Sequence, residues 1–310
     1  MTLNILYAGN PNEWDTYRET LSHKLTAAGL SHDLRNDLAR DQVDYIVYAP
    51  NGPIADFEGF DRLKAVLSLW AGVERIVGIP SLRVPLTRMV DHGLTQGMTE
   101  WVLGHTLRHH LNLDADINRA PGDWDPHYPP LAQERSVTIL GVGKLGQACA
   151  RALLAVGFPV TGWSRSAKTL DGIATEHGTE GLKRALSSAQ ILITLLPNTP
   201  ETENTLNTES LGRLSRGAVI INPGRGTLID DNALLAALDS GQVGHATLDV
   251  FRVEPLPEDH PYWTHPRVTV TPHIAAETRA STASDVIVEN IRRNEAGEEM
   301  LYLADRALGY

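Results

Sequence analysis

Residues 137–146, Val137-Thr138-Ile139-Leu140-Gly141-Val142-Gly143-Lys144-Leu145-Gly146, decide the fold of this 310-residue chain. The first four predict a strand, and the G-x-G-x-x-G spacing that follows predicts a tight turn into a helix. In such a turn Gly141 permits the bend, Gly143 lets the backbone approach a pyrophosphate, and Gly146 lets helix and strand pack closely. The helix N-terminus favours an anion, because its N–H groups are free and the helix dipole is positive there. The stretch therefore predicts a dinucleotide site.

Composition limits the class of protein. The chain is 42% hydrophobic and 21% charged, and its length leaves room for two domains. A formal net charge of −11 argues against nucleic acid or an anionic membrane as partner. The first residues lack the pattern of a signal peptide, and no apolar run is long enough to span a bilayer. The single cysteine, Cys149, fits a reducing compartment, so we expect a cytoplasmic protein.

Alternating strands and helices predict α/β architecture with parallel sheets. Strands are expected at 3–8, 44–49, 65–70, 137–141, 159–164, 190–196, 217–222, 245–250 and 267–271. The last six, with helices between them, are typical of a doubly wound nucleotide-binding sheet. A final helix, 281–296, is expected to pack back on the first domain. We therefore predict two doubly wound domains, a Rossmann domain (97–280) inserted in a discontinuous flavodoxin-like substrate domain (1–96 and 281–310).

One long helix is predicted for residues 97–118. His105 and His109 lie four residues apart on it, which is a spacing found in metal sites. Neither an H-E-x-x-H motif nor a third ligand accompanies them, so we expect a structural role and no metal. The Pro- and Gly-containing stretch 121–130 then marks a candidate boundary before the glycine turn.

The end of the second strand of the Rossmann domain indicates which dinucleotide binds. An NAD-selective site usually has an acid there to hold the ribose 2′-hydroxyl. This chain has Ser164-Arg165-Ser166-Ala167-Lys168 instead, whose hydroxyls, guanidinium and ammonium suit a 2′-phosphate. The alternative is a solvated basic strand end. We predict NADPH, with NADH weaker, bound by this cluster, by the three glycines and by Lys144 and Leu145.

Polar groups follow three successive strands at the edge where open α/β sheets bind ligands: Arg225, then Asp249 and Glu254, then His273. An arginine, an acid and a histidine that converge on a nicotinamide ring form a carbonyl-reduction site. We expect His273 to be the general acid, with Glu254 orienting its imidazole and favouring the charged form. Arg225 is expected to bind a substrate carboxylate and polarise the carbonyl, and Asp249 to face the nicotinamide.

A second candidate site lies in the first domain. Strand 65–70 ends at Trp70, and the small-residue turn Ala71-Gly72-Val73 then opens a short helix. Such a turn exposes backbone N–H groups that suit a carboxylate or phosphate. Every βα unit has a turn of this kind, so a purely structural role stays open. The wall near Tyr48–Gly52 and Trp70 is aromatic and tight, which favours substrates of two to four carbons.

These motifs resemble the D-isomer-specific 2-hydroxyacid dehydrogenase family. The resemblance covers nearly the whole chain and rests on Gly141–Gly146, Asn222–Gly226, Leu248–Pro257 and Thr271–Ala276. Within the family, three further stretches are most similar to bacterial NADPH-dependent glyoxylate/hydroxypyruvate reductases: Trp163–Ser166, Leu195–Thr202 and Asp305–Tyr310.

The resemblance implies catalytic roles for Arg225, Glu254 and His273, in agreement with the reasoning from the residues. It implies that Ala71, Gly72 and Val73 give backbone contacts to the substrate carboxylate, and that Leu196, Pro197 and Pro223 border the cofactor. One departure is Pro223-Gly224, where the family more often has a small residue and alanine, which puts the substrate fit in question.

The family usually forms dimers, so the resemblance also implies a homodimer through residues 97–130. Trp124 stands where some members place a tryptophan that reaches the partner's active site.

The sequence therefore predicts reduction of a small 2-keto acid, glyoxylate or hydroxypyruvate, to the D-2-hydroxy acid with NADPH. One alternative is a non-catalytic NAD(P)-sensing protein of the same fold, and another is a reductase of larger 2-keto acids. The intact set of Arg225, Glu254 and His273 favours an enzyme.

Overall fold

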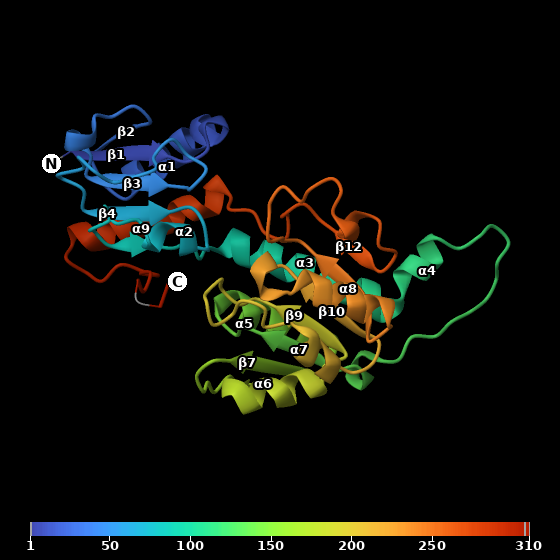
Figure 1. Ribbon diagram of the computed structural model, residues 1–310. Coiled ribbons are helices and arrows are strands. Elements are labelled where there is room, and N and C mark those ends of the chain that lie inside the picture. The colour runs from blue at the N-terminus through green and yellow to red at the C-terminus, as the bar shows by residue number, and fades with distance from the viewer. Residues whose placement is uncertain (1, 307, 310) are drawn as a thin grey trace. The chain divides into compact units, whose positions relative to one another are not determined.

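The computed structural model describes residues 2–306, 308 and 309 (Figure 1). The chain divides into two compact units: unit 1 is Met1–Leu94 with Glu277–Tyr310, and unit 2 is Thr95–Ala276. The predicted boundaries, 96 and 281, lie two and four residues from these ends at 94 and 277. Of the C-terminal stretch Asp305–Tyr310, positions 307 and 310 lie outside the described residues.

Unit 1 contains a five-stranded parallel sheet of order β2-β1-β3-β4-β5, which is the flavodoxin-like order. Its strands are β1 (Leu3–Ala8), β2 (His32–Arg35), β3 (Tyr45–Tyr48), β4 (Ala65–Ser68) and β5 (Leu86–Thr87). Its helices are α1 (Trp14–Ala27), α2 (Glu74–Val77) and α9 (Ala280–Glu295). Helices α1 and α9 share one apolar core with the sheet, so the C-terminal helix completes the N-terminal unit as predicted.

Unit 2 contains a seven-stranded parallel sheet of order β12-β11-β10-β9-β6-β7-β8. The strands are β6 (Val137–Leu140), β7 (Val160–Ser164), β8 (Ala174–His177), β9 (Ile191–Thr194), β10 (Ala218–Asn222), β11 (Val243–Leu248) and β12 (Val268–Val270). The helices are α4 (Leu113–Ile117), α5 (Lys144–Val156), α6 (Gly178–Ser187), α7 (Thr208–Arg213) and α8 (Asp231–Asp239), while α3 (His92–Leu111) begins in unit 1. Short 3₁₀ helices are found at Pro11–Glu13, Arg40–Gln42, Ala132–Glu134, Gly226–Leu228 and Pro261–Trp263. Two doubly wound parallel sheets, one of them Rossmann-like, confirm the predicted fold class.

The prediction of six strands in the second sheet was wrong, because β8 (ATEH) makes a seventh. This strand pairs only with β7, at the sheet edge, and its side chains are exposed or half-buried. An edge strand without an apolar face carries no hydrophobic pattern from which to predict it. In unit 1, β2 and the two-residue β5 were missed as well.

The single helix predicted for 97–118 is two helices. Helix α3 begins earlier, at His92, because the Asp91 carboxylate accepts hydrogen bonds from the N–H groups of Gly93 and Leu94. It ends at Leu111, since Asn112 has φ 56°, in the left-handed region that asparagine enters more easily than most residues. Within the described part of the chain, no helix is long and apolar enough to cross a membrane.

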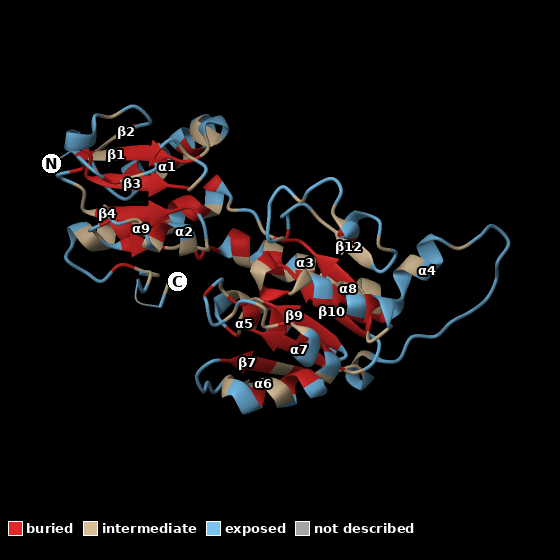
Figure 2. Cartoon of the chain, in the orientation of Figure 1, coloured by how far each residue is buried: buried red, intermediate tan, exposed pale blue. Residues whose placement is uncertain are grey.

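The central strands of both sheets are buried along their whole length, as Figure 2 shows. Strand β6 (VTIL), strand β9 (ILIT) and strand β10 (AVIIN) contain no exposed residue. Helices cover both faces of such a sheet, so its strands read as continuous apolar runs. The polar groups of interest therefore lie where the strands end.

Candidate active site

The glycine turn after β6 fits a pyrophosphate. Gly141 has φ 101°, and a Cβ there would lie 2.5 Å from the Leu195 carbonyl oxygen. A Cβ on Gly146 would lie 2.0 Å from the Gly141 oxygen, whereas one on Gly143 would meet nothing within 4 Å. Helix α5 begins directly after Gly143, and no side chain caps it. The turn therefore presents open backbone and a helix N-terminus, which suit a phosphate group.

The basic cluster at the end of β7 lies beside this turn. The Lys168 Nζ donates to the Val142 carbonyl oxygen at 3.3 Å, which joins the cluster to the glycine turn. Arg165, Ser166 and Lys168 are exposed, while Ser164 is buried and its hydroxyl donates to the Ser166 oxygen at 2.8 Å. Ser164 thus holds the bend from which the two cations project. An exposed pair of cations next to a pyrophosphate site fits a phosphorylated ribose.

Two proline-containing segments follow β9 and β10 at the same sheet edge. Leu196 and Pro197 follow β9, and Leu196 is buried in the core of unit 2. Pro223 and Gly224 follow β10 and are both buried. A Cβ on Gly224 would lie 2.7 Å from the Thr194 oxygen, so an alanine would require the backbone to shift. Close packing on the end of β9 therefore favours glycine at position 224.

His273 and Glu254 form a direct pair. The His273 Nδ1 lies 2.8 Å from the Glu254 Oε2, and the other carboxylate oxygen accepts the Phe251 N–H at 2.8 Å. Glu254 is thus fixed at both oxygens, and Nε2 is the histidine nitrogen that can face a substrate. The His273 side chain is 56% exposed, so it can be reached from solvent.

The pair shifts the pKa of each partner toward its charged form. The hydrogen bond to Glu254 raises the pKa of His273, against the opposing effects of burial and the Arg225 charge. Burial raises the pKa of Glu254, but the hydrogen bonds from His273 and the Phe251 N–H outweigh it, so the net shift is downward. At neutral pH the glutamate is ionised and favours a charged imidazole.

Asp249 holds the segment that carries His273. It is 1% exposed, and its carboxylate accepts three hydrogen bonds, from the Thr271 hydroxyl (2.6 Å), the Ile274 N–H (2.9 Å) and the Ala275 N–H (2.9 Å). His273 itself has φ 55°, a conformation that costs a non-glycine residue about 1–3 kcal/mol. The anchor around it offsets this cost. Sequence reasoning placed Asp249 at the cofactor and missed this role.

Arg225 lies in the loop after β10. Its Nη1 donates to the Gly224 oxygen at 2.7 Å, and its charge acts on the pKa values of both Glu254 and His273. A Cβ on Gly226 would lie 2.0 Å from the Phe251 carbonyl carbon, so the two loops touch at their backbones. Unit 2 thus brings the three predicted catalytic residues together.

In unit 1, the turn Ala71-Gly72-Val73 follows β4. Trp70 is 36% exposed, Ala71 and Gly72 are half-buried, and Val73 is buried. The Ser68 hydroxyl accepts the Trp70 N–H at 3.0 Å, and the Thr278 hydroxyl donates to the Leu69 oxygen at 2.7 Å. These bonds fix the chain that leads into the turn.

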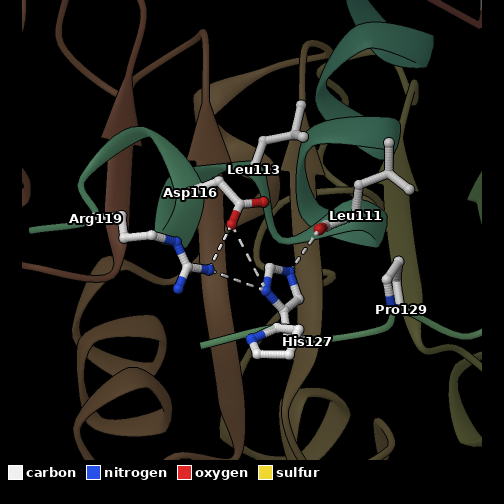
Figure 3. A pocket seen from close by; sticks show the side chains of 7 residues that line it. Leu111, Leu113, Asp116, Arg119, His127 and Pro129 are labelled. Atoms are coloured by element: carbon white, nitrogen blue, oxygen red, sulfur yellow. Dashed lines mark hydrogen bonds and ion pairs between the residues drawn. The ribbon is translucent and has the colours of Figure 1, made fainter. Parts of the chain in front are cut away.

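A cavity of about 350 Å³ contains none of these residues. Figure 3 shows the side chains that line it. It is lined by Leu111, Leu113, Asp116, Arg119, Pro126, His127 and Pro129. Its polar groups bond one another: Arg119 donates to Asp116 at 2.7 Å, and His127 Nε2 lies 3.3 Å from the Leu111 oxygen. These bonds tie the segment after α4 to the end of α3, so we assign the cavity to structure and not to catalysis.

His109 of α3 packs against strand β11. His109 Nε2 lies 2.8 Å from the Thr247 hydroxyl, and the His109 and His245 ring centroids are 4.7 Å apart. Burial lowers the pKa of His109 to about 3 and that of His245 to about 4, so both are neutral. No group of three His, Cys, Asp or Glu arranged to hold a metal occurs among the described residues. Cys149 is buried too, and burial raises its pKa to about 12.

Known proteins resemble this chain in sequence and in structure. The family profile described as D-isomer specific 2-hydroxyacid dehydrogenase, NAD binding domain, matches residues 101–275. A glyoxylate/hydroxypyruvate reductase A of Serratia proteamaculans (strain 568) is 43% identical over 257 residues, which are 80% of this chain and 82% of that protein.

Two solved structures cover 100% of this chain with 100% of their own. A D-isomer specific 2-hydroxyacid dehydrogenase from Xanthobacter autotrophicus Py2, in complex with NADPH and MES, has a TM-score of 0.93 and 38% identity. An NADPH-dependent glyoxylate/hydroxypyruvate reductase from Sinorhizobium meliloti, in complex with NADP and sulfate, has a TM-score of 0.87 and 34% identity. The family predicted from the motifs is confirmed: the chain belongs to the D-isomer specific 2-hydroxyacid dehydrogenases, which are NAD(P)-dependent enzymes.

Proposed function

We propose that this protein reduces glyoxylate or hydroxypyruvate to the D-2-hydroxy acid, glycolate or D-glycerate, with NADPH. The observation that carries the proposal is the His273–Glu254 contact of 2.8 Å, at the sheet edge that also bears Arg225. The names of the Serratia and Sinorhizobium relatives support this substrate class.

Proton transfer is the task of His273. The bound cofactor supplies a hydride to the carbonyl carbon, so negative charge develops on the carbonyl oxygen. Charged His273 donates the Nε2 proton to that oxygen and becomes neutral, while Glu254 keeps the Nδ1 proton in place. The product is the hydroxy acid, and His273 regains its proton from solvent. The contact to Glu254 thus selects the nitrogen that acts.

Within unit 2, substrate binding is the task of Arg225. The Arg225 guanidinium would hold the substrate carboxylate with paired donors and polarise the adjacent carbonyl. In unit 1, Trp70 and the backbone N–H groups of Ala71, Gly72 and Val73 are the substrate contacts that the family resemblance implies. A carboxylate held at a fixed distance from the carbonyl orients a 2-keto acid for hydride transfer.

NADPH would be held by groups at one edge of the unit 2 sheet. The pyrophosphate would lie on Gly141, Gly143, Lys144, Leu145 and Gly146, and the 2′-phosphate on Ser164, Arg165, Ser166 and Lys168. The nicotinamide would be bordered by Leu196, Pro197, Pro223 and Gly224. The open backbone at Gly143 and the exposed cations after β7 support this assignment, as do relatives crystallised with NADPH or NADP.

The test is an NADPH-oxidation assay across glyoxylate, hydroxypyruvate, pyruvate and bulkier 2-keto acids, repeated with NADH. We expect the highest kcat/KM for glyoxylate or hydroxypyruvate with NADPH. A preference for NADH would overturn the role of the basic cluster, and a preference for a bulky acid would overturn the substrate assignment. If NADPH binds but no acid is reduced, the protein is a dinucleotide sensor.

We also propose a homodimer formed through residues 97–130. In Figure 1 the segment after α4 extends away from the unit 2 sheet before it returns to β6. Large apolar side chains are exposed at the end of α4 and along this segment: Ile117 (75%), Trp124 (94%) and Tyr128 (88%). Apolar groups this exposed mark interaction surfaces. Sedimentation should give twice 33.9 kDa, and a species of 33.9 kDa would contradict the proposal.

A further inference from the structure

Asn222, the last residue of β10, is fully buried and joins three parts of unit 2. Its Oδ1 accepts the Thr194 hydroxyl at 2.6 Å and the Gly224 N–H at 3.1 Å. Its Nδ2 donates to the Arg225 carbonyl oxygen at 2.9 Å. The one amide therefore connects the end of β9 to the loop that carries Arg225. We call Thr194, Asn222 and Gly224 the amide clamp.

Strand register places the two side chains of the clamp together. Strands β9 and β10 pair in parallel, with Ile193 opposite Ile221, so Thr194 and Asn222 are the next pair along. Thr194 is 1% exposed. A hydroxyl and an amide that are buried side by side at strand ends lose their hydrogen bonds to water. The hydrogen bond between them compensates for that loss.

The clamp also explains why position 224 is glycine. The backbone at Gly224 approaches the Thr194 oxygen so closely that a Cβ would lie 2.7 Å from it. The Gly224 N–H donates to the Asn222 Oδ1, and the Gly224 carbonyl oxygen accepts a hydrogen bond from the Arg225 Nη1 at 2.7 Å. Hydrogen bonds therefore connect the Thr194 hydroxyl, through the Asn222 amide and the Gly224 backbone, to the Arg225 guanidinium. Of these four groups, only the Arg225 side chain is flexible.

We propose that Asn222 and Thr194 are positioning residues for Arg225: the clamp sets where the guanidinium meets the substrate carboxylate. The inference rests on the proposed function. Both side chains are buried, so neither is exposed to a substrate. Both act through the backbone of residues 224 and 225, and a displacement of about 1 Å there is enough to cost a large part of the rate.

The test uses Thr194→Val, which removes the clamp hydroxyl at nearly constant volume, and Thr194→Ser, which keeps it. The matched control is Thr138→Val. Thr138 is equally buried on the neighbouring strand β6, but its hydroxyl donates to the Ala185 oxygen at 3.1 Å, away from the Arg225 loop. Each variant is also made in an Arg225→Ala background.

We expect Thr194→Val to lower kcat/KM for glyoxylate about tenfold, mainly through KM, with NADPH affinity within about twofold. Thr194→Ser and Thr138→Val should stay within about twofold of wild type. In the Arg225→Ala background, Thr194→Val should change kcat/KM less than about twofold, because residues that act through one group are not additive. An equal loss in both backgrounds, or an equal loss in the Thr138→Val control, overturns the inference.

Oxalate, a two-carbon anion, gives a readout independent of turnover. Its Kd for the protein–NADPH complex should rise about tenfold in Thr194→Val and stay near wild type in Thr194→Ser. An unchanged oxalate Kd overturns the inference whether or not the wild type reduces a keto acid. Absence of turnover in the wild type, with the oxalate effect intact, overturns only the proposed reaction.

Discussion

The loops that carry Arg225 and His273 leave the same sheet edge but are held by different chemistry. Residues 222–226 are held by an uncharged amide, Asn222, and Arg225 keeps extended backbone with φ −143°. Residues 271–275 are held by a buried carboxylate, Asp249, and His273 has φ 55°.

The difference follows from what each loop must do. Hydrogen bonds to a charged acceptor are stronger than those to a neutral one, so a carboxylate can hold the strained backbone at His273. A carboxylate in the place of Asn222 would instead lie beside Arg225 and compete with the substrate carboxylate for its positive charge. A neutral clamp fixes that loop without opposing the binding of an anionic substrate.

The largest expected effect is in the His273 loop. His273→Ala should lower kcat by about 10² or more, because it removes the proton donor. NADPH affinity should stay within about twofold, since the glycine turn and the basic cluster are untouched. Stopped-flow NADPH oxidation and a fluorescence titration measure the two quantities. Near-normal turnover removes His273 from the mechanism.

Arg225→Ala should lower kcat/KM about 30- to 100-fold, the loss of a charge-assisted hydrogen-bonded contact. Unlike the His273 variant, it should raise KM and lower kcat together, because Arg225 serves binding and polarisation. Steady-state kinetics with glyoxylate decide this. If KM alone rises, Arg225 binds the carboxylate and does not polarise the carbonyl.

Asp249→Asn should lower kcat about tenfold, because it shifts the His273 segment. An amide offers one acceptor oxygen where the carboxylate offers two, so at least one of three donors loses its partner. Turnover should fall while NADPH affinity changes by less than about twofold. A large loss of NADPH affinity at unchanged kcat would show that Asp249 acts at the nicotinamide and not through His273.

The smallest expected effect at neutral pH is on stability, and it concerns two buried histidines outside both loops. His109 and His245 have pKa values of about 3 and 4 in the fold, against about 6.5 unfolded. Their contribution to stability is complete above pH 6.5 and is lost as pH falls from there toward 4. The loss is at most about 1.4 kcal/mol per pH unit for each histidine.

His109→Gln should therefore flatten the fall of the thermal midpoint between pH 6.5 and 5. The exposed histidine His23 on α1 supplies the control, since His23→Gln should leave the fall unchanged. If all three proteins lose stability in parallel, the buried pair does not cause acid sensitivity. A flattened curve would assign the acid sensitivity to the buried pair and not to His273, whose charged form is favoured at acid pH.

Sequence reasoning predicted the proposed catalytic residues better than the residues that hold them. Arg225, Glu254 and His273 follow three strands, and parallel strands must end at one edge, so their meeting could be predicted. The clamp of Asn222 on Thr194 depends on strand order, because β9 and β10 pair only once the sheet is known. Asn222, the last residue of β10, belongs to the motif 222–226, but the motif does not reveal that its side chain is buried.

An edge strand and a helix break limited the prediction of the fold. The polar edge strand β8 has no hydrophobic pattern, and Asn112 breaks a helix whose apolar residues continue on both sides. The strand depends on its pairing with β7, and the helix break depends on the left-handed backbone at Asn112, which the apolar pattern does not reveal.

The pH dependence of reduction in wild type and Glu254→Gln tests the central claim most directly. The Glu254 hydrogen bond raises the pKa of His273, so kcat/KM should be high at acid pH and fall as pH rises through that pKa. Glu254→Gln removes the charge, and the fall should then begin about one pH unit lower. A rate that rises with pH, or the same midpoint in both proteins, would contradict a Glu254-supported His273 as the proton donor.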